Sequence, residues 1–166
     1  MSETEISLRR GWTTGACATA AAKAAFSALI TGQFPDPVEI TLPKGQRVSF
    51  SLAKERLAET SAMAAVIKDA GDDPDVTHGA LVEVTISIDQ SSSGISFRSG
   101  EGVGTVTKVG LPIGVGEPAI NPIPREMIKN AILEVSKTNK KQVGVIVEIS
   151  IPGGEEIALK TWNPRL

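Results

Sequence analysis

The pattern of hydrophobic and polar positions predicts two long helices and about eight strands. The first helix is expected over residues 15–30, where alanine, the best helix former, dominates, and Gly32 should end it. Because its side chains are small nearly all round, we expect this helix to lie flat against a sheet. A second helix should start near Pro124 and run to about Lys137. Its apolar residues follow helical spacing: Met127, Ile128, Ala131, Ile132 and Val135.

Short apolar runs predict the strands. Residues 80–88 alternate between apolar and polar side chains and should form a strand with one solvent-facing side. Residues 38–42 and 48–52 should form a hairpin around the turn Pro-Lys-Gly-Gln at 43–46. The remaining expected strands are 64–68, 95–98 paired with 104–108, and 143–151 paired with 156–162. Helices and strands do not alternate strictly, so the prediction is an α+β fold with a mixed or antiparallel sheet, in one domain spanning residues 1–166.

Composition indicates an ordinary globular chain of 166 residues, 41% hydrophobic and 22% charged, with a net charge of -2. The mild acidity and the absence of tyrosine argue against nucleic acid as a partner. No apolar run is long enough to span a membrane, and the first residues are acidic where a signal peptide would be basic, so we expect a cytoplasmic protein without a membrane partner. A single cysteine and a single histidine exclude an internal disulfide and a structural zinc site, and no resident metal is expected.

The densest chemistry lies between Lys68 and Gly79, where four aspartates and the only histidine follow a short buried strand. Carboxylates so close together repel one another, which favours a functional role for Asp72, Asp73, Asp75 and His78 at the exit of that strand. The alternative is a solvated turn in which aspartates accept hydrogen bonds from nearby backbone N–H groups.

Two further segments, residues 11–15 and residues 116–125, have side chains and backbone groups that suit anions. Thr13 and Thr14, flanked by glycines at the start of the first helix, offer hydroxyls and backbone N–H groups to a carboxylate, although simple helix capping is the alternative. Cys17 in the first turn is read as a packed structural cysteine, with a Cys-His nucleophile as the weaker alternative.

Before the second helix, three prolines stiffen residues 116–125 and hold Glu117, Asn121 and Arg125 in place. Arg125 can bind a carboxylate through two parallel hydrogen bonds, and a rigid surface loop is the alternative. The glycines of residues 100–104 have the spacing of a nucleotide-binding loop, but β-like residues follow them instead of a helix, so a bent substrate loop is expected.

These segments together resemble the CbiD family, the cobalt-precorrin-5B C(1)-methyltransferases of anaerobic cobalamin (vitamin B12) biosynthesis. The resemblance implies methyl transfer from S-adenosylmethionine to C1 of a cobalt-containing tetrapyrrole. It also implies a first domain like domain 2 of ribosomal protein S5, followed by a Rossmann-like domain. The matching segments are GWTTGACATAAAKAA at 11–25, KDAGDDPDVTHG at 68–79, GEGVGTVTK at 100–108, GEPAINPIPREMI at 116–128 and TWNPRL at 161–166.

Family members continue beyond the equivalent of Leu166 into a glycine-rich segment and a further domain. We therefore expect this chain to be the N-terminal part of such an enzyme, inactive alone, with the donor site largely outside it. The missing domain or a second copy of the chain would be its protein partner.

For the anionic substrate, the implied binding residues are Thr13, Thr14, Lys68, Lys108, Glu117, Asn121 and Arg125, which offer scattered polar and cationic groups in a chain that is not globally basic. Asp72, Asp73, Asp75 and His78 would hold the sulfonium of the donor or remove a proton from the ring. Two other functions stay open. One is a non-catalytic tetrapyrrole-binding or assembly module that acts with a separate partner domain, and the other is an unrelated hydrolase that uses the aspartates to bind a divalent metal ion.

Overall fold

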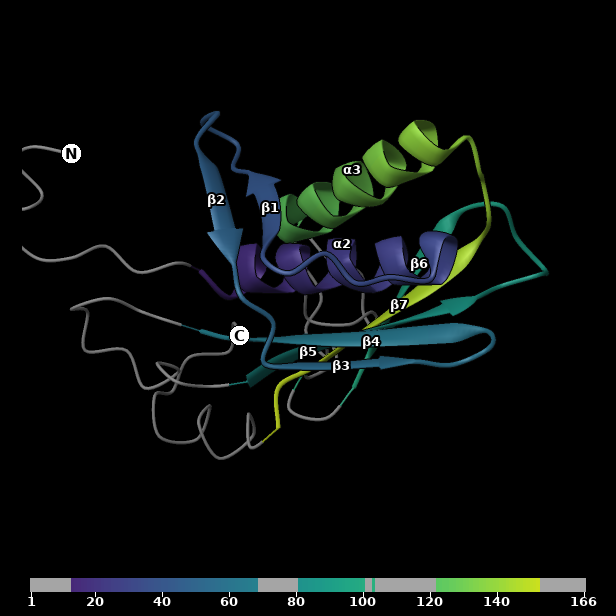
Figure 1. Cartoon of the computed structure of the whole chain (residues 1–166), viewed down its shortest axis with the longest axis horizontal. Coiled ribbons are helices and arrows are strands. Elements are labelled where there is room, and N and C mark those ends of the chain that lie inside the picture. The colour runs from purple at the N-terminus through teal and green to yellow at the C-terminus, as the bar shows by residue number, and fades with distance from the viewer. Residues whose placement is uncertain (1–12, 69–80, 101–102, 104–121, 153–166) are drawn as a thin grey trace, which may run out of the picture.

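The computed structural model of the chain describes residues 13–68, 81–100, 103 and 122–152, which form two helices and seven strands (Figure 1). In chain order these elements are α2 (Thr14–Thr31), β1 (Val38–Thr41), β2 (Arg47–Phe50), β3 (Lys54–Leu57), β4 (Ser61–Ile67), β5 (Leu81–Ile88), β6 (Ile95–Ser99), α3 (Pro122–Asn139) and β7 (Val145–Ser150).

The main sheet has five strands in the order β3-β4-β5-β7-β6. Neighbouring strands are antiparallel except β6 and β7, which run parallel and are joined through α3. Among the described strands, the last in sequence, β7, therefore lies between two earlier ones. Strands β1 and β2 form a separate antiparallel hairpin. The α+β class with a mixed sheet, predicted from the sequence, is confirmed.

Helix α2 lies between the main sheet and α3 (Figure 1), packed against β4 and β5 on one side and α3 on the other. Its alanines are buried along nearly the whole helix, as expected from the absence of large side chains. Gly32 ends the helix with φ of 85°, a left-handed conformation that glycine adopts without steric cost. Residues of both sheets and both helices share one hydrophobic cluster around Phe26. Among the described residues, neither helix combines the length and apolar character needed to cross a membrane.

Most expected elements are present, and some bounds differ. The hairpin forms as predicted, with Thr41 opposite Arg47, and the second helix begins at Pro122, slightly before the expected start. The fourth strand begins at Ser61, where the sequence predicted a start at residue 64. Strand β3 was missed because its four residues are all exposed at the sheet edge and show no apolar alternation. The expected strands 104–108 and 156–162 lie outside the described residues.

Candidate functional site

The segments that contain the predicted site residues have their described ends at one end of the main sheet, where β4 ends and β5 begins. We call this end of the sheet, as distinct from its outer strands, the edge. At this edge, Ile67 of β4 lies opposite Leu81 of β5. These two strands flank the acidic segment that contains Asp72, Asp73, Asp75 and His78, all of which lie outside the described residues. Strands β6 and β7 end at the same edge, since Ser99 is opposite Ile149 and β7 also pairs with the start of β5.

The first turns of both helices meet at this edge. A Cβ added to Gly15 in α2 would lie 2.9 Å from Cγ of Pro124 in α3, so the two backbones approach as closely as a glycine allows. The guanidinium carbon of Arg125 lies 5.2 Å from the ring centroid of Phe97, which connects the start of α3 to the middle of β6. Because each helix N-terminus carries a partial positive charge, their convergence with Arg125 makes the edge favourable for anions.

Thr13 caps α2, which confirms the simpler of the two sequence interpretations for its hydroxyl. Its Oγ1 accepts a hydrogen bond from the Ala16 N–H at 3.0 Å, and its carbonyl accepts one from the Cys17 N–H at 3.1 Å. In the described part of the chain, the N–H groups of Thr14 and Gly15 have no hydrogen-bond partner. These two donors belong to the first turn of α2, in which N–H groups have no partner within the helix, and they lie beside the exposed Thr13.

The structure describes two of the predicted basic residues, Lys68 and Arg125. Lys68 directly follows β4 and is 7% exposed, on the same face of the sheet as the buried Val66. Arg125 is half-buried and its planar group lies over Phe97, which fixes the orientation of the guanidinium. The structure therefore brings Thr13, Thr14 and Arg125 together at the two helix starts and places Lys68 separately at the end of β4, whereas Lys108, Glu117 and Asn121 lie outside the described residues.

Cys17 is completely buried in the first turn of α2. A catalytic thiol must reach its substrate, so the interpretation as a packed structural cysteine is the one that the structure supports. Within the ranges that the structure describes, no cluster of three His, Cys, Asp or Glu residues has a geometry that could hold a metal ion.

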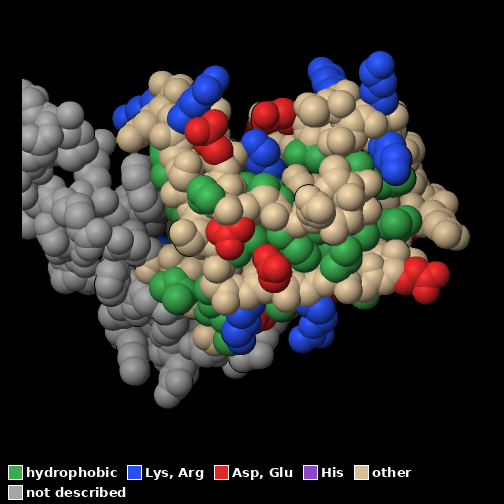
Figure 2. Space-filling model, in the orientation of Figure 1, with side chains coloured by type: hydrophobic (Ala, Val, Ile, Leu, Met, Phe, Trp, Pro, Cys, Tyr) green, Lys and Arg blue, Asp and Glu red, His purple; other side chains and the backbone are tan. Residues whose placement is uncertain are grey.

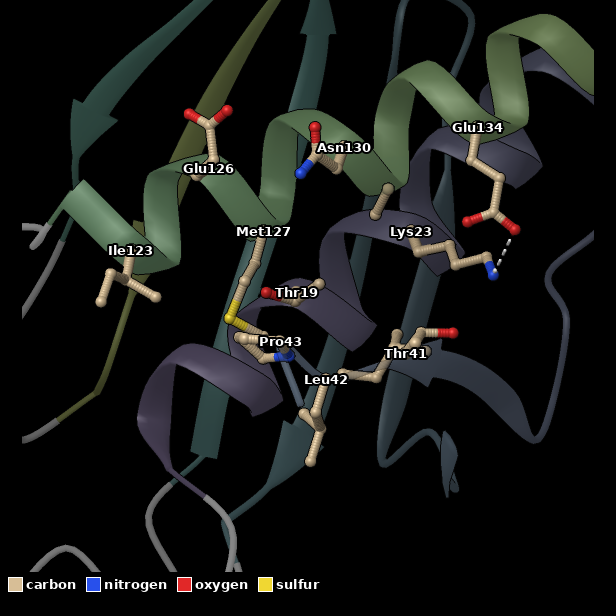
Figure 3. Close-up of a pocket in the computed structure, with 12 residues that line it drawn as sticks. Thr19, Lys23, Thr41, Leu42, Pro43, Ile123, Glu126, Met127, Asn130 and Glu134 are labelled. Carbon is tan, nitrogen blue, oxygen red and sulfur yellow. Dashed lines mark ion pairs between the residues drawn. The ribbon is translucent and has the colours of Figure 1, made fainter. Parts of the chain in front are cut away.

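The sequence did not predict a pocket of about 410 Å³ between α2, α3 and the β1–β2 hairpin (Figure 3). The space-filling view shows the corresponding hollow between the hairpin and α3, with acidic and basic side chains around it (Figure 2). The pocket is lined by Thr19, Lys23, Ile40, Thr41, Leu42, Pro43, Ile123, Glu126, Met127, Asn130, Ala131 and Glu134.

Charged groups of both signs line this pocket. Lys23 is the one charged residue in the sequence of α2, and its Nζ donates to the carbonyl oxygen of Glu39 at 2.7 Å. The same Nζ lies 3.6 Å from Oε1 of Glu134, with the lysine side chain 20% exposed and the glutamate 65% exposed. Glu126 has no ion-pair partner among the described residues. With two carboxylates and one ammonium, the pocket has a net negative charge.

Two sequence signals could have indicated the pocket. Lys23 interrupts an alanine-rich helix, where a lone charge needs a polar partner. Glu126, Asn130 and Glu134 recur every four residues and so share one face of α3. The β1–β2 hairpin closes the pocket through tertiary packing on the two helices. No local sequence pattern predicts that packing, so the pocket could not be predicted from the sequence.

The comparisons with known proteins agree on one family. The CbiD family model matches residues 1–166. A cobalt-precorrin-5B C(1)-methyltransferase of Brucella anthropi is 57% identical over 165 residues, which are 99% of this chain and 45% of the relative. A protein of the same name from Paramagnetospirillum magneticum is 54% identical over 162 residues, 98% of this chain and 45% of the relative.

A solved structure agrees with the sequence comparisons. The crystal structure of a cobalamin biosynthesis protein (cbiD) from Archaeoglobus fulgidus matches with a TM-score of 0.66 and 32% identity, over 93% of this chain and 47% of that one. The chain thus spans about 45% of the length of the curated relatives described above.

Proposed function

Because this chain belongs to the CbiD family, we propose that it forms the tetrapyrrole-binding part of a cobalt-precorrin-5B C(1)-methyltransferase of cobalamin biosynthesis. The reaction would transfer the methyl group of S-adenosylmethionine to C1 of a cobalt-containing tetrapyrrole. As part of the same proposal, residues 1–166 are a single cytoplasmic domain with a fold like domain 2 of ribosomal protein S5. The remaining length of the relatives would supply the rest of the enzyme.

The observation that carries the proposal is the close approach of two helix N-termini, with Arg125 in the first turn of α3 held over Phe97. A corrin precursor carries acetate and propionate side chains around its rim. Helix N-termini and guanidinium groups are the protein groups best suited to carboxylates, and they act locally in a chain whose net charge is -2. The edge therefore fits a polycarboxylate better than the overall composition would suggest.

Each described residue has a proposed task at this edge. The N–H groups of Thr14 and Gly15 donate to one substrate carboxylate, and Arg125, held over Phe97, receives a second. Lys68 provides a positive charge on the helix-covered side of the sheet. Lys108, Glu117 and Asn121 are proposed to extend this binding surface, and Asp72, Asp73, Asp75 and His78 to stabilise the donor cation or accept a proton.

S-adenosylmethionine supplies an activated methyl group on a positively charged sulfur. Methyl transfer is a displacement at that carbon, and a protein accelerates it chiefly by holding the two reactants in line. By fixing the substrate carboxylates to two helix ends and a stacked guanidinium, this chain would orient C1 of the ring for attack.

A second candidate function is a non-catalytic tetrapyrrole-binding module that acts with a separate domain. The same groups at the two helix starts support it, because they concern the carboxylates of the tetrapyrrole and not the methyl donor. The two functions differ in turnover, because the module alone binds tetrapyrrole and transfers no methyl group.

Tetrapyrrole binding tests the proposal directly. Cobyrinic acid, a cobalt corrin with free side-chain carboxylates, should change its visible spectrum on titration with the chain, and its methyl ester should bind much more weakly. Arg125→Lys should weaken binding about fivefold to tenfold, since it keeps the charge and loses the paired hydrogen bonds. Arg47→Lys, an exposed change on the hairpin, is the matched control and should leave the affinity unchanged. Equal binding of acid and ester, or an Arg125→Lys variant that binds like the wild type, would refute the assignment.

A further inference from the structure

We propose that the pocket between α2, α3 and the β1–β2 hairpin binds the methyl donor, S-adenosylmethionine. This inference rests on the proposed methyl-transfer function. It also differs from the expectation drawn from the sequence, which put the donor site largely outside this chain.

The charges of the pocket complement those of the donor. S-adenosylmethionine carries two positive groups, the sulfonium and the ammonium, and one carboxylate. The pocket carries two carboxylates, Glu126 and Glu134, and one ammonium, Lys23. A polyanionic tetrapyrrole would be repelled by this net negative lining, whereas a molecule with a net positive charge is attracted.

The ion pair between Lys23 and Glu134 can open to admit a zwitterion. At 3.6 Å the two charged atoms are beyond hydrogen-bond distance, and an ammonium group has three donors, of which the Glu39 carbonyl accepts one. The donor carboxylate can accept from Lys23 while the Glu134 carboxylate receives the donor ammonium. Because the Lys23 side chain is 20% exposed, its charge is only partly screened by water.

The remaining lining suits the adenosine part of the donor. Ile40, Leu42, Pro43, Ile123 and Met127 present apolar surface, and Figure 3 shows the Met127 side chain extending from α3 toward Pro43. A thioether beside a flat aromatic ring is a favourable contact. The volume of about 410 Å³ falls within the range typical of small-molecule sites, roughly 300–1,000 Å³.

Helix α3 separates the two charge types. Arg125 and Lys129 lie over Phe97, with the Lys129 Nζ 6.0 Å from the ring centroid, whereas Glu126 and Glu134 line the pocket. One helix thus presents a basic side toward β6 and an acidic side toward the hairpin. The anionic methyl acceptor and the cationic methyl donor can therefore bind on different sides of the same helix.

One end of the pocket lies next to the helix starts at which the tetrapyrrole is proposed to bind. Ile123 lines the pocket, and the next residue, Pro124, touches Gly15 in the first turn of α2. Glu126 lies on the pocket rim and its side chain points away from Met127 in Figure 3. At an exposed position, rotation about its side-chain bonds brings the carboxylate over the pocket at little cost. A sulfonium at this end would lie beside the acceptor, as in-line transfer requires.

Calorimetric titration of the 166-residue chain with S-adenosylmethionine and S-adenosylhomocysteine tests the proposal without turnover. The second compound has a neutral thioether in place of the sulfonium, so we expect it to bind about fivefold more weakly. Glu126→Gln should weaken S-adenosylmethionine binding about threefold to fivefold and leave S-adenosylhomocysteine unaffected. Glu55→Gln, the same change on exposed β3, is the matched control and should alter neither affinity.

A blocking variant tests the location independently of charge. Asn130→Trp should fill the pocket and reduce binding of both compounds more than tenfold, whereas Lys137→Trp, exposed near the end of the same helix, should not. Circular dichroism of both variants serves as the control for folding. Wild-type affinity in Asn130→Trp, or no measurable donor binding to the wild-type chain, would overturn the proposal. If cobyrinic acid still binds in that case, the tetrapyrrole-binding function stands and only the donor site is wrong.

Discussion

The contact between Gly15 and Pro124 makes a sharp prediction about how the two helix starts are held together. In Gly15→Ala, the new Cβ would lie 2.9 Å from Cγ and 3.2 Å from Cβ of Pro124. The proline ring cannot rotate away, so α2 and α3 must separate slightly. Forcing a methyl group into a packed contact costs about 1–3 kcal/mol. Replacing glycine by alanine in a helix gains up to about 1 kcal/mol.

The two effects together predict a net loss of about 1 kcal/mol in the free energy of unfolding. For a chain of this size that loss lowers the melting temperature by about 2–4 °C. In a Pro124→Ala background the nearer atom, Cγ, is absent, and the remaining contact with Cβ at 3.2 Å can relax without the proline ring, so the alanine preference prevails and Gly15→Ala should be neutral or stabilising. The sign of the effect is therefore expected to depend on residue 124.

Urea denaturation followed by circular dichroism, applied to the wild type, both single variants and the double variant, measures the coupling. A coupling energy of about 1–2 kcal/mol is expected for residues in direct contact. If Gly15→Ala changes stability equally in both backgrounds, within about 0.5 kcal/mol, the two helix starts do not constrain each other as described. The titration with cobyrinic acid should weaken in the single Gly15→Ala variant, because the separation displaces Thr14 from the carboxylate site.

Three further predictions concern the rest of the fold. Gly144→Ala should destabilise the chain by more than about 3 kcal/mol, because its Cβ would collide with the backbone carbonyl of Ser92, and denaturation showing a loss under about 1 kcal/mol would contradict this. Val147→Ala, fully buried in the central strand β7, should cost about 2 kcal/mol in the same assay, and a loss below about 0.5 kcal/mol would show that the site is loosely packed. Hydrogen bonds from the Ser91 hydroxyl and then its backbone N–H lower the pKa of Asp89, so the associated stabilisation is present above about pH 4 and is lost as the pH falls through the folded-state pKa. Ser91→Ala should raise that pKa, and an NMR titration of Asp89 unchanged by the substitution would refute the hydrogen-bond explanation.

Local sequence patterns correctly predicted the elements whose formation depends on residues close together in the sequence. The alanine-rich run and Gly32 located α2, and the glycine turn located the β1–β2 hairpin, because propensity and turn geometry act over a few residues. The parallel pairing of β6 with β7 could not be read in this way. It joins Ile95 to Val145 through a helical crossover, and no local signal specifies such a partner.

In the candidate site, too, the features that depend on neighbouring residues were predicted from the sequence, and those that depend on the tertiary fold were not. The sequence identified Thr13 and Arg125 separately from helix-start chemistry, and packing of α2 on α3 brought their helix starts together. The pocket was missed because it is enclosed by residues from three elements, including Lys23, Leu42 and Glu126, whose proximity depends on the tertiary fold.

The position of β7 has a consequence for synthesis on the ribosome. Strands β5 and β6 leave the ribosome well before residues 145–150, yet in the folded chain they are held apart by this last strand, with Val84 opposite Ile149 on one side and Phe97 opposite Val147 on the other. Until β7 emerges, the two earlier strands have an unfilled gap between them and the alanine-rich surface of α2 has no complete sheet to cover it. The nascent chain therefore has to keep these edges from pairing with each other or with neighbouring chains, and folding of the domain is completed only after translation of its final described strand.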